Sequence, residues 1–130
     1  MDTNRKFISV VSRLNRLTQE GELTWRRMDP PTDLTAGTGD VVTAFYGTKF
    51  EGRNLGIYEI RYKAWDPDRD TVFWANNAAV ALFTDNWEKE WTFPYVAGID
   101  ELMRSVEYQN ANVDTFISKL LGNAQEQEEI

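Results

Sequence analysis

The sequence predicts an α+β domain in which an antiparallel sheet of five or six strands carries an N-terminal and a C-terminal helix on one face. Apolar residues recur with a helical period at both ends of the chain, and alternating segments fill the middle. Most of the alternating segments are joined by short turns, which connect antiparallel neighbours. Two amphipathic helices that bracket such a sheet are expected on the same face, leaving the other face to water, a ligand or another subunit.

The N-terminal helix is predicted from an apolar stripe at three- and four-residue spacing. Gly21 follows the last member of the stripe and can adopt the left-handed conformation that ends a helix. Basic residues such as Arg13 and Arg16 fall outside the stripe. The stripe consists of Phe7, Val10, Val11, Leu14 and Leu17.

A first strand and a long loop come next. Apolar and polar residues alternate in Glu22–Arg27, with Leu23 and Trp25 on one face, which is typical of a strand. Met28–Asp40 contains two prolines and two glycines and predicts a loop. Loops of this length are more often functional or mobile than shorter ones.

A hairpin is predicted from Val41–Phe50 and Leu55–Ala64, with its turn at Glu51–Asn54. In the second arm Tyr58, Ile60 and Tyr62 share one face. The opposite face changes along the strand from apolar residues to charged ones.

The remaining strands are shorter in this prediction. Trp65–Asp70 forms a turn, and Asn76-Asn77 separates two strands, Thr71–Ala75 and Ala79–Thr84. Glu90–Tyr95 is expected to be a last short strand that Pro94 ends.

The C-terminal region returns to a helical period after Gly98 and keeps it to Leu120. Asn110–Asn112 lies midway, and the sequence leaves open whether one helix or two form there. Residues 1–121 are expected to make a single domain. Residues 122–130 form an acidic tail without apolar anchors, which we expect to be flexible.

The composition limits the classes of function. The 130 residues include no histidine and no cysteine, which removes the usual general base, thiolate chemistry and nearly all zinc sites. A net charge of −7 argues against a general nucleic-acid binder. No apolar run is long enough to span a bilayer and none resembles a signal peptide, so we expect a cytoplasmic protein without membrane association.

The charge is unevenly distributed along the chain. Residues 1–27 carry six basic and three acidic side chains, whereas the rest of the chain carries 8 basic and 18 acidic ones. This pattern fits either an anion-binding face near the N-terminus or a solvated helix face that complements acidic strands.

No motif marks a catalytic, metal or cofactor site. Asp66, Asp68 and Asp70 have the spacing that opens a calcium loop, but Thr71 and Asn77 replace the required glycine and glutamate, so a turn is favoured. Gly37-Thr38-Gly39 lacks the remainder of a phosphate loop. Glu59 lies mid-strand and is interpreted as a partner in a cross-strand charge pair rather than as a catalytic acid.

Aromatic and arginine side chains give the remaining signal. Rings interleaved with guanidinium groups suit stacking on a base and pairing with phosphate, although aromatic residues also fill cores. Trp87 and Trp91 suggest an exposed aromatic ridge for an oligomer contact, and we expect a homo-oligomer. The predicted ligand-binding residues are Trp25, Arg26, Arg27, Tyr46, Tyr58, Arg61, Trp65 and Trp74.

The segment Leu17–Trp25 resembles the start of small bacterial proteins of unassigned role, in which a helix ending in threonine-x-x-glycine leads into a strand with tryptophan. The overall plan is also similar to secretion chaperones and to phage proteins that sequester nucleotide signals. These resemblances assign no function. From the aromatic and arginine side chains we predict a non-catalytic protein that sequesters a small anionic, nucleotide-like ligand. The alternatives are a protein-interaction module, such as a secretion chaperone or immunity protein, and, third, an enzyme that relies on carboxylates and a divalent metal.

Overall fold

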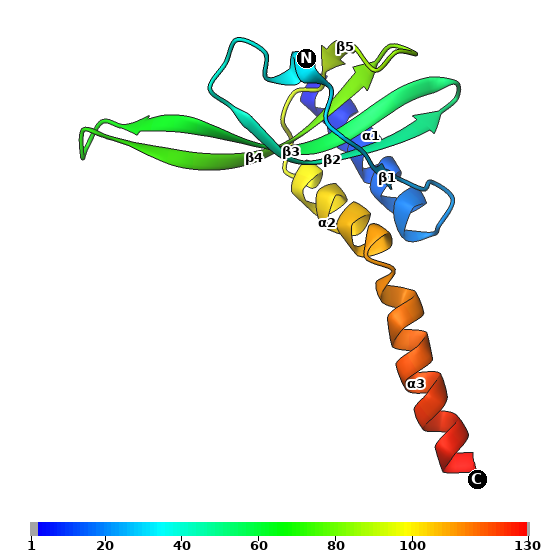
Figure 1. Ribbon diagram of the computed structural model, residues 1–130. Coiled ribbons are helices and arrows are strands. Elements are labelled where there is room, and N and C mark those ends of the chain that lie inside the picture. The colour runs from blue at the N-terminus through cyan, green and yellow to red at the C-terminus, as the bar shows by residue number, and fades with distance from the viewer. Residues whose placement is uncertain (1–2, 130) are drawn as a thin grey trace.

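The computed structural model describes the backbone of residues 3–129 and the side chains of residues 4–122. It contains one five-stranded antiparallel sheet in the order β1-β2-β3-β4-β5, together with three α-helices (Figure 1). The predicted α+β fold is therefore confirmed. The helices are α1 (Thr3–Gln19), α2 (Gly98–Asn110) and α3 (Val113–Glu129), and a short 3-10 helix, η1, covers Thr32–Leu34.

Helix α1 ends as its sequence predicts. Gly21 has a φ of +77°, and its N–H donates to the carbonyl of Thr18 at 3.1 Å. The N–H of Glu22 donates to the carbonyl of Leu17 at 2.9 Å. These two bonds form the glycine-terminated cap in which carbonyls of the last turn are satisfied by the residues that follow.

Strand β1 covers only Arg26–Arg27, whereas the alternation predicted a strand from Glu22. The backbone N–H of Trp25 donates instead to Oε1 of Gln109 on α2, at 2.8 Å. The indole N–H of Trp25 donates to Oγ1 of Thr18 at 2.9 Å. The segment before β1 is thus held by the helices, and its apolar side chains enter the core without joining the ladder.

Strands β2 (Val41–Phe50) and β3 (Arg53–Asp66) form a tight hairpin. Glu51 and Gly52 have φ values of +51° and +78°, as a two-residue turn of the hairpin type requires. Strand β3 therefore begins two residues before the predicted Leu55.

Strand β4 (Thr71–Phe83) is continuous, although Asn76-Asn77 predicted a break. Asn76 and Asn77 pair with Arg61 and Ile60 of β3, because β3 is long enough to offer partners along the whole of β4. Strand β5 (Lys89–Thr92) closes the sheet before Pro94. Val41, the first residue of β2, pairs with Arg61 of β3. Residues 62–75 lie past this point and have no third strand beside them, so they extend from the body as a two-stranded ribbon, named here the arm (Figure 1).

Helices α1 and α2 pack on the same face of the sheet, named here the helix face. The main buried cluster joins α1 and α2 to alternate residues of β2, β3 and β4. Its largest fully buried aliphatic members are Val11, Ile57, Val80, Ile99, Leu102 and Val106.

Asn112 breaks the C-terminal region into two helices. Its φ of +54° lies in the left-handed region, which ends α2 before α3 begins. Helix α3 then runs away from the sheet (Figure 1). The predicted domain boundary at residue 121 falls inside α3, while the side chains of residues 123–130 lie outside the described part. The flexibility of the tail stays a prediction.

The opposite face, named here the loop face, is covered in part by the loop of residues 28–40 and by the turn before β5. A second buried cluster lies here and consists of Leu34, Phe45, Tyr58, Ala81 and Phe83, with Met28 and Trp87 packed against it. Gly47 and Gly56 pair across β2 and β3. A Cβ on Gly56 would lie 2.7 Å from the rings of Phe45 and Phe83, so glycine is required for this close packing.

No helix in residues 3–129 is both long enough and apolar enough to cross a bilayer.

Candidate functional site

The eight residues predicted to bind a ligand do not form one site. Trp25 and Tyr46 are buried in the cluster on the helix face, and Tyr58 is buried on the loop face. Arg26 and Arg27 are exposed on β1. Arg61, Trp65 and Trp74 are exposed at the base of the arm or along it.

Arg27 and Tyr46 come together on the helix face. The guanidinium carbon lies 5.5 Å from the centre of the tyrosine ring, and Nη1 lies 3.5 Å from the hydroxyl. Nη2 also donates to the carbonyl of Thr43 at 3.2 Å. The exposed Arg27 side chain is thus engaged by contacts within the protein and covers the buried ring of Tyr46.

A second predicted pair, Arg61 and Trp74, forms on the arm. The guanidinium of Arg61 and the ammonium of Lys63 lie 5.3 Å and 5.4 Å from the centres of Trp74 rings. Trp65 is 60% exposed, and its indole N–H donates to Asp70. These side chains make an exposed cation–aromatic strip on one side of a two-stranded ribbon, which lacks the walls of a binding cavity.

A cleft on the loop face combines two cations, Arg26 and Lys49, with the indole of Trp87, and we name it the Trp87 cleft. It lies beside β1, and its volume is about 590 Å³. Arg26 pairs in register with Gly47, and Lys49 follows two residues later on the same face of β2, so both cations reach the cleft. Its lining residues are Thr24, Trp25, Arg26, Met28, Gly47, Thr48, Lys49, Asn54, Asp85 and Trp87.

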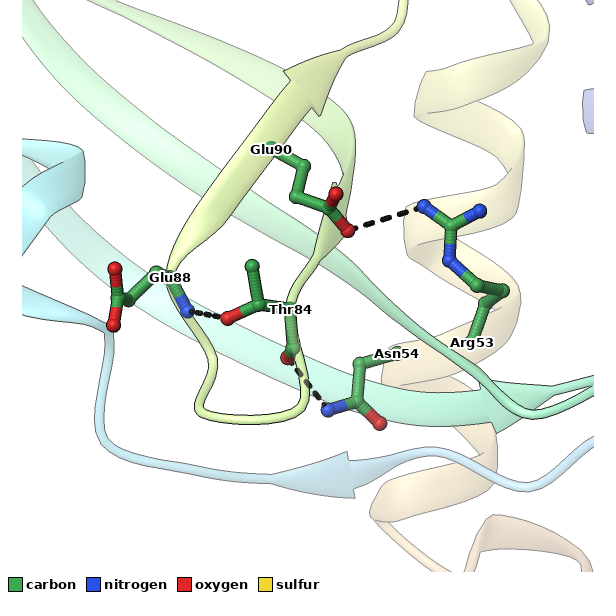
Figure 2. A network of polar contacts seen from close by, with 5 residues as sticks. All are labelled: Arg53, Asn54, Thr84, Glu88 and Glu90. Atoms are coloured by element: carbon green, nitrogen blue, oxygen red, sulfur yellow. Dashed lines mark hydrogen bonds and ion pairs between the residues drawn. The ribbon is translucent and has the colours of Figure 1, made fainter.

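Thr84 fixes the turn that carries Trp87. The carbonyl of Thr84 accepts bonds from the Trp87 N–H at 2.9 Å and from Nδ2 of Asn54 at 2.9 Å. Its hydroxyl accepts the N–H of Glu88 at 3.1 Å (Figure 2). Its own N–H donates to the Glu88 carbonyl at 2.8 Å. Arg53 and Glu90 form an ion pair at 3.1 Å beside this network (Figure 2).

Trp87 itself has a φ of +61°, a conformation that is rare for a bulky residue and costs on the order of 1–3 kcal/mol. Its ring packs against Phe45 and Phe83, with centroids 6.0 Å and 5.6 Å away. Its outer edge would lie 2.6 Å from a Cβ on Gly47. The position of the indole is therefore imposed by the surrounding structure.

The cations of the Trp87 cleft are available. Among residues 4–122, whose side chains the structure describes, no ion pair or side-chain hydrogen bond engages Arg26 or Lys49. Asp85 supplies one carboxylate to the same lining, so the cleft carries an excess of positive charge within an acidic protein.

A cavity of similar volume, about 600 Å³, lies where α1, α2 and the start of α3 meet. Several of its polar groups bond to each other. Gln109 accepts the Trp25 N–H and donates to the carbonyls of Thr18 and Leu23, and Ser105 donates to Asn15. These bonds join α1 to α2 and to the segment before β1, so these polar groups already have partners within the protein.

Lys49 and Trp87 are members of the cleft that sequence reasoning missed. Neither was assigned to a ligand site from the sequence, since Lys49 is the next-to-last residue of β2 and Trp87, which was expected in an oligomer contact, follows the turn residues Asp85-Asn86. The predicted ridge of Trp87 and Trp91 is wrong. Trp91 pairs with Leu82 and contacts Phe7 on the helix face, whereas Trp87 lies on the loop face.

The acidic candidates take structural roles. Asp66 accepts the N–H of Asp68 at 3.0 Å, as the turn interpretation expects. Glu59 faces Ala44 and Ala78 in register and accepts a bond from Thr43 at 2.6 Å, so the expected cross-strand charge pair does not form there. In the described residues, no group of three or more acidic side chains is placed to hold a metal ion.

No family model, no curated protein and no solved structure matches this chain. A function for the protein therefore rests on the side chains that its own fold brings together, among which those of the Trp87 cleft are the best placed to meet a ligand.

Proposed function

We propose that the protein is a non-catalytic binding protein that sequesters a small anionic ligand carrying a ring, such as a mononucleotide, in the Trp87 cleft. The observation that carries this proposal is the presence of two unpaired cations, Arg26 and Lys49, beside an indole in one cleft of about 590 Å³. Small-molecule sites commonly have volumes of about 300–1,000 Å³. The lining of this cleft is mainly polar, which fits a charged ligand.

The arrangement of charges supports an anion. Arg26 and Lys49 come from neighbouring strands held in fixed register, so their separation is set by the sheet. Arginine can bind phosphate or carboxylate with two parallel hydrogen bonds, and lysine adds a point charge. Asn54 is buried beside them, where its amide group already bonds to Thr84.

The strained backbone of Trp87 also supports a site. Positive φ values at bulky residues persist only where the surroundings impose them, and they concentrate at binding and active sites. Here the hydrogen bonds of Thr84 and the packing against Phe45 and Phe83 impose the conformation. A ring held in this way can stack on a planar ligand with little loss of entropy.

Calorimetric titration with inorganic phosphate, adenosine monophosphate and uridine monophosphate tests the proposal. We expect at least one nucleotide to bind, and Arg26→Ala and Lys49→Ala each to weaken that binding about 10- to 100-fold, since a charged hydrogen bond contributes about 1.5–3 kcal/mol. The melting temperature should stay unchanged, because both side chains are exposed and unpaired.

Arg61→Ala is the matched control, since it removes an exposed arginine that contacts an indole on the arm. Equal losses in Arg61→Ala and Arg26→Ala would contradict a site in the cleft. The absence of binding by all three probes at millimolar concentration would contradict the ligand class.

A protein-interaction role is a second candidate, favoured by the arm. Trp65, Val72 and Trp74 lie on one side of the arm, and all three are large, apolar and about half exposed or more. Exposed aromatic residues with arginine are typical of contact surfaces between proteins. Under this candidate, Arg61→Ala rather than Arg26→Ala is the variant that weakens binding.

A further inference from the structure

Helix α3 presents an apolar stripe to solvent. Phe116, Leu120 and Leu121 are 66%, 60% and 56% exposed, and Ile117 lies beside them at 39%. Val113, Phe116, Ile117 and Leu120 occupy positions i, i+3, i+4 and i+7, the spacing of anchor residues in helices that bind a groove. Leu121 follows at i+8. The described part of the chain brings no large element over this stripe, because α3 leaves the body at Asn112 (Figure 1).

An apolar groove of about 480 Å³ lies on the body, between α1 and the β2–β3 hairpin. Val10, Leu14 and Leu17 of α1 form one wall, and residues of the sheet and of the segment after β5 form the other. Val10 is 36% exposed and Phe50 is 43% exposed there. The groove is distinct from the Trp87 cleft, since its walls belong to the helix face.

The groove and the stripe match in length. The α1 wall from Val10 to Leu17 spans about 10 Å at about 1.5 Å per residue, and the stripe from Val113 to Leu121 spans about 12 Å. A helix of this length can therefore place its apolar side chains along the whole groove.

The charges of α1 and α3 are also complementary, and they favour one direction of α3 along α1. Helix α1 contains four basic residues and no acidic one, whereas the far end of α3 carries Glu126, Glu128 and Glu129. With α3 antiparallel to α1, its acidic end lies near Lys6. In the parallel direction it would lie near Glu20 and Glu22, where like charges repel.

We propose that α3 of one copy binds the groove beside α1 of a second copy, antiparallel to α1, so that the protein forms a homodimer by exchange of its C-terminal helices. Each copy then supplies one helix and one groove, as a two-fold symmetric dimer requires. The exchange covers the apolar stripe and pairs the basic helix with the acidic one. This proposal does not depend on the function of the Trp87 cleft.

Sedimentation equilibrium on the full chain tests the dimer. We expect a dimer whose dissociation constant rises at least about 30-fold in Leu120→Asp and in Val10→Asp, because each change places a charge in the apolar contact. Val72→Asp on the arm is the matched control and should leave the constant unchanged, since Val72 is equally apolar and 61% exposed. A monomer at all concentrations overturns the proposal, as does equal weakening by Val72→Asp.

Thiol crosslinking tests the direction, and the absence of native cysteine makes each link unambiguous. A mixture of Ser9→Cys and Leu121→Cys proteins should give a crosslinked heterodimer, and a mixture of Gln19→Cys and Leu121→Cys should not. The proposal is overturned if crosslinks form only between two Leu121→Cys chains, or only between Gln19→Cys and Leu121→Cys chains. It is also overturned if a Ser9→Cys/Leu121→Cys double variant is monomeric and forms the link within one chain.

Discussion

The two faces of the sheet bury different kinds of side chain. The helix face buries aliphatic side chains from α1, α2 and three strands, with Val11, Ile99 and Leu102 fully inaccessible. The loop face buries mainly aromatic rings beneath a loop, and its flat packing depends on paired glycines. Charged side chains without a hydrogen-bond or ion-pair partner in the described residues, Arg26 and Lys49, lie at the edge of the loop face.

This difference indicates that one face mainly stabilises the fold and that the other mainly binds a ligand. The helix face buries more apolar residues than the loop face, so we expect it to contribute more to the folding free energy. A loop covers less surface and leaves openings, and a bound molecule can fill these openings. The helix face is therefore expected to tolerate change least, and the loop face to carry the ligand.

Two leucines give a direct measure of this contrast. Leu102→Ala on α2 should lower the free energy of unfolding by about 4 kcal/mol, because a fully buried leucine leaves a cavity. Leu34→Ala under the loop should cost about 2 kcal/mol, since its side chain keeps 9% exposure and the loop can collapse onto the space. Urea denaturation of both variants checks this, and an equal loss in the two would remove the distinction between the faces.

The glycine pair tests whether the loop face is as closely packed as its contacts indicate. Gly56→Ala should destabilise the protein by about 1–3 kcal/mol, because the added Cβ would lie 2.7 Å from two aromatic rings. Gly39→Ala is the control, since nothing lies within 4 Å of its Cβ position. Thermal unfolding would show the difference, and a neutral Gly56→Ala would mean that the rings can move aside.

The smallest expected effect is a change in the pH dependence of stability at alkaline pH when Tyr58, on the loop face, is replaced. Burial raises the pKa of the Tyr58 hydroxyl above 10.0, the Asp33 charge raises it further, and a hydrogen bond with Thr92 lowers it in part. The resulting stabilisation is complete below the unfolded pKa of about 10 and is lost as pH rises through the folded value. Tyr58→Phe should therefore lose less stability than the natural protein between pH 9 and 11 in urea titrations.

Tyr95→Phe is the control for that titration. Its hydroxyl also has a raised pKa, because it donates a hydrogen bond to Asp100, but Tyr95 is 51% exposed. A pH dependence that disappears in Tyr95→Phe rather than in Tyr58→Phe would place the alkaline sensitivity in the segment between β5 and α2 and away from the loop face.

The sequence was a good guide to elements and a poor guide to the site. The apolar stripe of α1, its end at Gly21 and the faces of β3 follow from spacing alone, since each depends on neighbours along the chain. The predicted ligand residues Tyr46 and Tyr58 are buried because of their positions in the sheet, and Trp25 is buried because α1 and α2 hold the segment before β1. Lys49 and Trp87 meet Arg26 only through strand register and a turn that folds back over the sheet.

The sequence by itself determined the α+β class, the order of elements and the absence of histidine and cysteine chemistry, because periodicity and composition are properties of the linear chain. Tertiary structure decided the rest. It joined the segments around Asn76 into one long β4, released α3 from the sheet at Asn112, and brought Arg26, Lys49 and Trp87 to a common cleft. These outcomes depend on contacts between residues that are distant in sequence, and local patterns do not encode such contacts individually.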